Sequence, residues 1–335
     1  MAAEAAAADK ESPPPLVLVA RKPSFGLPTG CPSCLPAYFY LRFADVSFHL
    51  QPNLTYPDSD QIPYVECGDY VAFNNEKGGV IESLKEDGVV DLDSGLPSRT
   101  VPEWLAMKAM ITTWLADAVS FELWAGTDRT SADTIYYSDL PWPIGKALHF
   151  MQTSKAKQLL EITKVNAERR ETEIYRRANL AYQALSTLLG EQTFFFENRP
   201  TSLDAVFLAH ALFTLQALPE TSLLKSKLLE HRNLVRYCED LKAKYLEAGP
   251  TSSSTIPKSP FEPSSSSTPR RGTRSNWSAK PKSKPKRERT EEEKTFKRRA
   301  KYFLATQFVA VLVFFALSGP ESDGEMDGND MEYDD

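Results

Sequence analysis

The sequence predicts an α/β part followed by an all-α part, with a single membrane-spanning helix near the C-terminus. Three observations lead to this fold class. Short apolar runs broken by turn residues extend to about residue 98, apolar residues spaced three and four apart dominate residues 99–248, and one long uncharged apolar run covers residues 302–318. The chain has 335 residues and a hydrophobic fraction of 41%, which is enough for a substantial core.

The first folded part, residues 15–98, alternates short apolar runs with loops rich in Pro and Gly. Runs of four to eight apolar residues bounded by turn residues are typical of buried strands. We therefore expect strands at 16–20, 46–50, 62–66 and 70–73, a helix that starts at the Cys31–Cys34 motif, and a second helix at 79–86. The predicted order is β-α-β followed by β-β-α.

The second folded part, residues 99–248, has the spacing of amphipathic helices. Pro102 suits the first turn of a helix because its missing N–H is not needed there. One apolar face then follows at intervals of three and four residues; it consists of Trp104, Met107, Ile111, Trp114, Ala118 and Phe121. We expect further helices at 173–189, with Gly190 as its stop signal, and at 202–218 and 223–246.

The remaining segments have biased compositions. Residues 1–14 are rich in Ala and Pro, and residues 249–299 form a Ser- and Pro-rich basic tract, so we expect a disordered N-terminus and a flexible linker. The N-terminus lacks the basic start and apolar centre of a secretion signal, so we expect reduced cysteines. The net charge of −6 argues against nucleic acid as a partner.

The apolar run at residues 302–318 predicts a transmembrane helix within 300–318, followed by an acidic tail at 319–335. Seventeen helical residues span about 26 Å, slightly less than a bilayer core. Arg298, Arg299 and Lys301 flank the run and can reach the lipid headgroups. By the positive-inside rule the folded parts face the cytosol. The segment is thus predicted to be a tail anchor in contact with the bilayer; a buried core helix fits less well because the run is apolar on every face.

The order of elements, with a Cys-x-x-Cys at the first helix and a helical second part, resembles the glutathione transferase fold, whose N-terminal domain is thioredoxin-like. Two further places carry this resemblance. Pro63, before a predicted strand, is similar to the cis-proline of that fold. Thr201 and Asp204 resemble its buried capping box, in which each side chain bonds to the backbone of the other residue.

Four stretches also resemble the metaxin family, in particular its plant-type branch: residues 18–25, 56–60, 135–142 and 229–237. The resemblance implies a non-catalytic subunit of the mitochondrial outer membrane import and sorting and assembly machinery, which inserts β-barrel precursors. It also implies that the partners are other subunits of that machinery and precursor proteins, and that the folded domains face the cytosol.

Cys31 and Cys34 are the main candidates for chemistry. A thiol at a helix N-terminus favours its thiolate, and a second thiol three residues later can resolve a mixed disulfide. The alternative is a pair of ordinary packed thiols, because no acid or base accompanies them in the sequence. The four histidines and the remaining cysteines lack metal-ligand spacing. We predict no metal, no cofactor and no catalytic residue.

Two other interpretations remain open from the sequence. A tail-anchored thiol or glutathione transferase would use the same Cys motif, although residues 73–76 read Phe-Asn-Asn-Glu where a glutathione site has a Glu/Gln-Ser pair. The same anchored protein on the endoplasmic reticulum is the second, because the tail after the apolar run is acidic, whereas mitochondrial tail anchors often carry basic residues there.

Overall fold

The structure is a computed structural model that describes residues 15–53, 60–76, 78–126, 128–141, 144–196 and 198–247. All of these residues belong to the first of the two compact units of the chain, Met1–Lys258. The predicted N-terminal segment 1–14, linker 249–299, transmembrane helix 300–318 with its flank Arg298, Arg299 and Lys301, and tail 319–335 lie outside the described residues. Among the residues that are described, no helix combines the length and apolar character needed to cross a bilayer.

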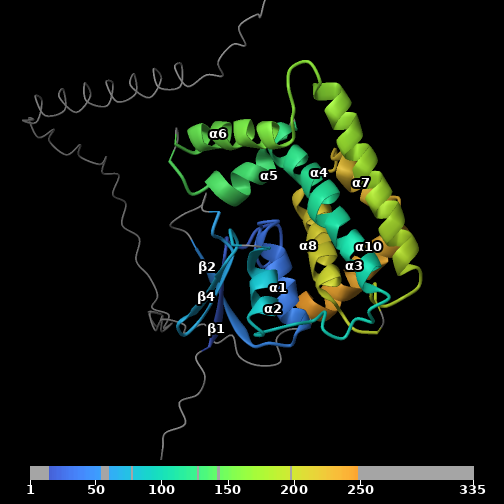
Figure 1. Ribbon diagram of the computed structural model, residues 1–335. Helices are drawn as coiled ribbons and strands as arrows, with labels where there is room; N and C mark the ends of the chain where they lie inside the picture. Colours follow the sequence, from blue (N-terminus) through green and yellow to red (C-terminus); the bar gives the residue numbers. More distant parts are fainter. Residues whose placement is uncertain are drawn as a thin grey trace, which may run out of the picture. The chain divides into compact units, whose positions relative to one another are not determined.

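The N-terminal part is a four-stranded sheet with two helices, in the strand order β2-β1-β3-β4. Strand β1 (Leu16–Ala20) runs parallel to β2 (Phe48–Pro52) and antiparallel to β3 (Tyr64–Cys67), which pairs in turn with β4 (Tyr70–Phe73). Helices α1 (Cys34–Phe43) and α2 (Gly79–Glu86) lie between the sheet and the helical part of the chain (Figure 1). The predicted thioredoxin-like order β-α-β-β-β-α is confirmed.

The C-terminal part is entirely helical, as predicted. Its first helix is continuous from residue 101 to 125 but changes twice from α-helical to π-helical geometry. The elements are α3 (Val101–Met110), η1 (Ile111–Leu115), α4 (Ala116–Ser120), η2 (Phe121–Ala125), α5 (Thr130–Ala132), η3 (Asp133–Tyr137), α6 (Ile144–Leu159), α7 (Ala167–Leu189), α8 (Ser202–Ala217), α9 (Leu223–Leu229), α10 (Arg232–Lys242) and η4 (Ala243–Glu247), where η marks a π-helical segment.

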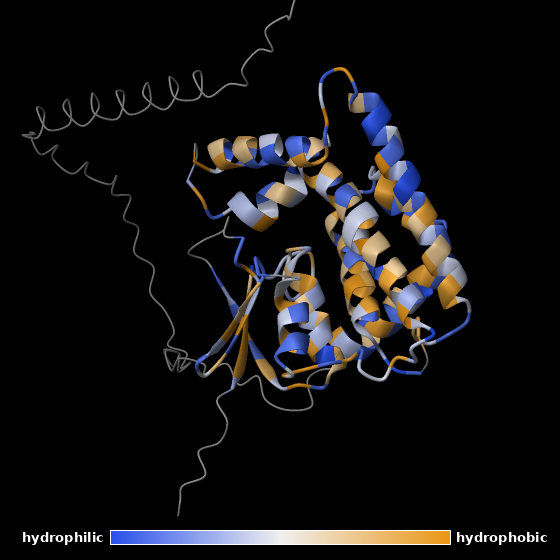
Figure 2. Cartoon of the chain, in the orientation of Figure 1, coloured by the Kyte–Doolittle hydropathy of each residue, from blue (hydrophilic) through white to orange (hydrophobic). Residues whose placement is uncertain are grey.

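Helix α8 is the centre of the helical part. Of its 16 residues, 14 are buried, and it packs directly against α1 of the N-terminal part. A helix that is apolar on all sides is stable only when other elements surround it. The N-terminal end of α7, in contrast, is strongly hydrophilic (Figure 2). The packing of α1 on α8 therefore makes one continuous core from the two parts.

Several predicted boundaries were wrong. Strand β2 occupies 48–52 rather than 46–50, and α7 starts at Ala167 rather than 173, because its first turns are polar and show no apolar period. The predicted helix 223–246 is interrupted at Glu230 and His231, where no Gly or Pro announces the break. Helix α6 was not predicted, since only His149 and Ala156 of its residues are buried and it has no clear apolar face.

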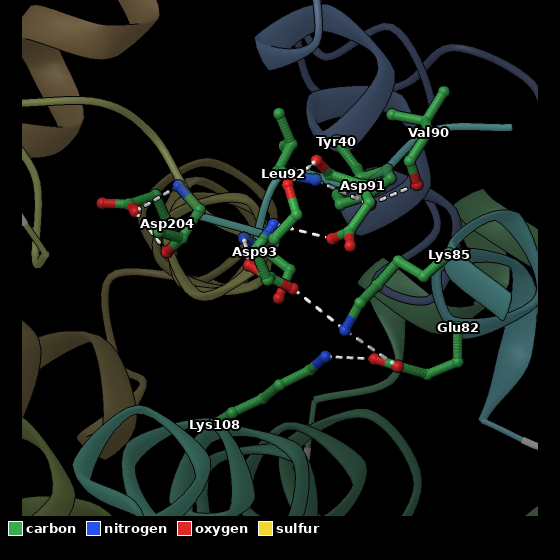
Figure 3. A network of polar contacts seen from close by, with 12 residues as sticks. Tyr40, Glu82, Lys85, Val90, Asp91, Leu92, Asp93, Lys108 and Asp204 are labelled. Atoms are coloured by element: carbon green, nitrogen blue, oxygen red, sulfur yellow. Dashed lines mark hydrogen bonds and ion pairs between the residues drawn. The ribbon is translucent and has the colours of Figure 1, made fainter. Parts of the chain in front are cut away.

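A polar network ties the segment after α2 to both parts of the fold (Figure 3). The Asp93 carboxylate accepts a hydrogen bond of 2.8 Å from the backbone N–H of Ser202, the first residue of α8. Its second oxygen lies 3.0 Å from the Lys85 ammonium on α2. Lys85 also contacts Glu82, which in turn pairs with Lys108 on α3. Charges on α2 and α3 thus hold in place a carboxylate that caps α8.

The same segment is fixed to α1 by the phenol of Tyr40. The hydroxyl donates to the carbonyl oxygen of Val90 at 2.9 Å and accepts from the N–H of Leu92 at 3.3 Å. Burial raises the pKa of Tyr40, so the hydroxyl keeps its proton at neutral pH. The Tyr40 hydrogen bonds join α1 to the segment at Val90 and Leu92, and Asp93 of the same segment bonds to the start of α8. The segment therefore links α1 and α8.

Candidate functional site

A cavity of about 610 Å³ lies where the N-terminal part meets the helices. Arg21, Cys31 and Ile62 line it from the N-terminal part, and residues of α6 and α8 line it from the other side. Three of the four π-helical segments of the described residues, η1, η2 and η3, also contribute side chains to its wall. Single π-helical turns within helices occur frequently at functional sites, because they redirect side chains. This cavity, with Cys31 in its wall, is the candidate site.

The Cys-x-x-Cys motif places its two thiols differently. Cys34 is the first residue of α1 and is completely buried, whereas Cys31 precedes the helix and lines the cavity with 2% of its surface exposed. A turn joins them, in which the N–H groups of Cys34 and Leu35 donate to the Cys31 carbonyl at 3.1 and 3.2 Å. Both thiols are free.

The surroundings of Cys31 favour its thiolate. Burial by itself raises the pKa of Cys31, because it removes water from the charged form. That effect is outweighed by a hydrogen bond from the Cys34 thiol, the positive charge of Arg21, a hydrogen bond from Tyr136 and the backbone of Ser33. Together they lower the pKa of Cys31 to about 5. For Cys34 the direction is the opposite: burial and the neighbouring Cys31 raise its pKa.

Arg21 and Tyr136 form the polar wall beside Cys31. The Tyr136 hydroxyl lies 3.6 Å from the Cys31 sulfur, and the Arg21 guanidinium stands over the Tyr136 ring, 4.7 Å from its centre. Burial and the charge of Cys31 raise the pKa of Tyr136, so the phenol remains a proton donor. A thiolate stabilised by one cation and three hydrogen-bond donors at a cavity is a nucleophile and does not need a separate base.

Pro63 and the turn after the hairpin lie near the same cavity. The Ile62–Pro63 peptide bond is cis, and Ile62 contributes to the cavity wall. Asn74 also lines the cavity, and its amide donates to the carbonyl of Asp60 at 3.5 Å. The Asn74 amide is thus directed to the backbone of its own domain.

Thr201 and Asp204 form a capping box at the start of α8. The Asp204 carboxylate accepts from the Thr201 N–H at 2.8 Å, from the Thr201 hydroxyl at 2.7 Å and from the Phe195 N–H at 3.0 Å. The Tyr237 hydroxyl on α10 donates to the same carboxylate at 2.7 Å. The box does not line the cavity; it fixes α8, whose residue His210 does.

Sequence reasoning did not identify Arg21 and Tyr136 as site residues. They are 115 positions apart (136 minus 21), so no local pattern connects them to the Cys motif. The signal that was available is the metaxin resemblance, because both lie in stretches that carry it, 18–25 and 135–142. Among the described residues no three His, Cys, Asp or Glu side chains gather as ligands for a metal ion.

Comparison with protein-family models gives two matches. Residues 32–130 match the glutathione S-transferase N-terminal domain, and residues 178–241 match the glutathione S-transferase C-terminal domain. The order of the two matches agrees with the sheet-containing part and the helical part described above. The predicted glutathione-transferase-like fold, with a thioredoxin-like N-terminal domain and a helical C-terminal domain, is confirmed.

Among solved structures, a glutathione transferase from Phanerochaete chrysosporium, GSTFuA3, is similar to 69% of this chain and 98% of its own, with 12% identity and a TM-score of 0.46.

Comparison with curated proteins gives a more specific result. The chain is 56% identical over 315 residues to an Arabidopsis thaliana protein named mitochondrial outer membrane import complex protein METAXIN, covering 94% of this chain and 96% of that protein. Mouse metaxin-1 is 26% identical over 67% of this chain and 73% of its own length. Mouse metaxin-2 is 25% identical over 56% of this chain and 71% of its own length. The chain belongs to the metaxin family.

Proposed function

We propose that this protein is a non-catalytic subunit of the protein import machinery of the mitochondrial outer membrane, with its folded domains facing the cytosol. The observation that carries the proposal is the 56% identity, over nearly the whole of both chains, to the Arabidopsis protein named for an import complex of that membrane. Within that role, the protein contacts subunits of the sorting and assembly machinery and β-barrel precursors. It acts by binding rather than by catalysis.

The membrane address is proposed to come from residues 302–318. This run has no charged side chain, and Arg298, Arg299 and Lys301 precede it on what would be the cytosolic side. The basic tract at 249–299 separates it from the folded domains and is rich in Ser and Pro, a composition typical of flexible linkers. The domain boundaries that belong to this proposal are 15–98 and 99–248.

A surface centred on α6 is the proposed site of contact with a partner subunit of the import machinery. Large apolar side chains that are exposed in the described residues gather on this helix and on the loop after it: Ile144, Phe150, Met151, Leu159 and Val165. Phe150 is 66% exposed and Leu159 is 74% exposed, so most of the surface of each side chain lies outside the core of the folded part. Concentrated apolar exposure of this kind marks interaction sites.

The charge on α6 indicates what kind of partner surface fits it. The helix carries Lys146, Lys155 and Lys157 and no acidic residue. Basic side chains interspersed with exposed apolar side chains are complementary to a partner surface that combines apolar and acidic residues, and such complementarity increases association rates and selects partners. We therefore expect α6 to bind an acidic surface of another import subunit.

Changing Phe150 and Met151 together to Asp tests this contact. The double variant places two negative charges in the apolar patch, and we expect at least a tenfold loss of import-complex subunits that co-purify with the protein, since buried interface anchors are worth about 1–4 kcal/mol each. The matched control is Leu105→Asp on α3, where the side chain is 57% exposed and far from α6 in sequence. Equal recovery of partners with the double variant and with the control would rule out α6 as the contact.

A second candidate function is thiol or glutathione transfer, and it is favoured by the lowered pKa of Cys31 beside the cavity. The test is the rate at which the full-length protein conjugates glutathione to a chlorodinitrobenzene electrophile. The proposed binding role predicts no rate above that of the Cys31→Ser variant. Turnover that depends on Cys31 and saturates with glutathione would replace the first proposal by the second.

A further inference from the structure

We propose that Cys31 is a site of reversible S-thiolation by low-molecular-weight disulfides that enter the cavity, and that Cys34 resolves the adduct into a Cys31–Cys34 disulfide. This inference goes beyond the proposed import role, because binding to partner subunits requires neither thiol. It concerns a stoichiometric modification of the protein and not a turnover reaction.

The first part of the argument is the position of Cys31 in the cavity wall, where 2% of its surface is exposed, and the charge around it. The cavity of about 610 Å³ is large enough for a small disulfide, and Cys31 is one of its lining residues. Arg21 and Tyr136 line the cavity as well, so an incoming disulfide meets the sulfur and its stabilising groups on the same wall. Because the pKa of Cys31 is lowered to about 5, the attacking thiolate is present at neutral pH.

The second part of the argument is the position of Cys34. It lies three positions after Cys31, at the first position of α1, and the Cys34 thiol is one of the groups that lower the pKa of Cys31. A turn of the backbone holds them together, with the Cys34 N–H bonded to the Cys31 carbonyl at 3.1 Å. The neighbouring Cys31 contributes to the raised pKa of Cys34, and that contribution is lost when Cys31 becomes a neutral mixed disulfide, so the Cys34 thiol then gives up its proton more easily. The resolving thiol is therefore in place.

The reaction balances with a disulfide, RSSR, as the oxidant. The Cys31 thiolate attacks one sulfur of RSSR, forming the mixed disulfide Cys31–S–SR and releasing RS⁻, which takes up a proton to give RSH. The Cys34 thiol then loses its proton and attacks the Cys31 sulfur, forming the Cys31–Cys34 bond and releasing the second RSH. Two protein thiols are oxidised and one disulfide is reduced to two thiols.

Cys238 provides an internal comparison for the reactivity of Cys31. It lies on α10, is completely buried and does not line the cavity. Burial raises the pKa of Cys238 well above its ordinary value. It therefore remains a protonated thiol at neutral pH, and it shows the reactivity of a buried thiol that has neither the cavity nor the polar wall formed by Arg21 and Tyr136.

The test treats the purified full-length chain, in a Cys67→Ser background that removes a partly exposed thiol, with 2-hydroxyethyl disulfide and follows its mass. We expect the Cys34→Ser variant to hold one mixed disulfide at Cys31, the Cys31→Ser variant to stay unmodified, and the chain with both cysteines to form the internal disulfide. A Cys31 that stays reduced in both the two-cysteine chain and Cys34→Ser overturns the proposal, as does a mixed disulfide that persists while Cys34 is present.

A second measurement, on the unsubstituted chain, does not depend on any variant folding correctly. The rate of alkylation of Cys31 by iodoacetamide should rise with a midpoint near pH 5, whereas an ordinary thiol has its midpoint near about pH 8.5. At about pH 6 we expect Cys31 to react roughly tenfold faster than an ordinary thiol, after allowing for its lower intrinsic nucleophilicity. A midpoint above about pH 8, or a rate no greater than that of Cys238, contradicts the proposal.

Discussion

Replacing Asp204 by Ala is expected to lower the free energy of unfolding of the folded domains by about 3–4 kcal/mol, which corresponds to a decrease in Tm of roughly 6–16 °C. The substitution removes a fully buried carboxylate to which Thr201, Phe195 and Tyr237 all donate hydrogen bonds. The donors lose their acceptor in a place that water does not reach, and each buried polar group left without a partner costs about 1–3 kcal/mol. Thermal unfolding of the full-length protein in detergent measures the effect.

Two variants show whether the loss comes from the buried network. Tyr237→Phe removes one of the donors and should cost about 1–2 kcal/mol. Asp139→Ala removes a carboxylate that pairs with Lys22 but is 66% exposed, and such surface pairs contribute about 0–1 kcal/mol. A Tm for Asp204→Ala within the range of Asp139→Ala would show that the capping box does not hold α8 in place.

The second large effect is expected at the proposed membrane anchor. Val311 lies near the middle of the apolar run 302–318, and an Arg there would have to sit in hydrocarbon at a cost of roughly 2.5–3.5 kcal/mol. The run is short, so it has little hydrophobicity in excess. We expect Val311→Arg to move the protein from the carbonate-resistant membrane fraction to the supernatant, with the Tm of the folded domains unchanged.

Val311→Leu is the matched control, because it changes the side chain at the same position and keeps it apolar. It should remain in the membrane fraction as fully as the unsubstituted protein. If Val311→Arg also resists carbonate extraction, residues 302–318 do not anchor the protein, and its membrane attachment has another origin.

Local sequence signals were sufficient for the fold class and for part of the site. The strands around residues 16–20 and 70–73 are short apolar runs between turn residues, so their identity follows from their own composition. The Thr201–Asp204 box is contained within four positions, and the Cys31–Cys34 motif is equally local. Patterns of this length can be read from one sequence, because each residue interacts mainly with its neighbours in the chain.

The remaining features depend on tertiary packing. Arg21 and Tyr136 meet Cys31 only because β1 and η3 approach the start of α1, and neither side chain carries a pattern of its own. Asp93 caps α8 across 109 positions of sequence, for the same reason. Helix α6 has few buried side chains, so it lacks the apolar period on which helix prediction rests.

The central claim, that the protein is an import subunit of the mitochondrial outer membrane, is tested most directly by the import of a radiolabelled β-barrel precursor. Mitochondria are isolated from cells that lack the protein and from cells in which the unsubstituted chain has been restored. We predict that the precursor accumulates unassembled in the first and is inserted at the normal rate in the second. Insertion at the same rate in both, with the restored protein present in the outer membrane, would contradict the account.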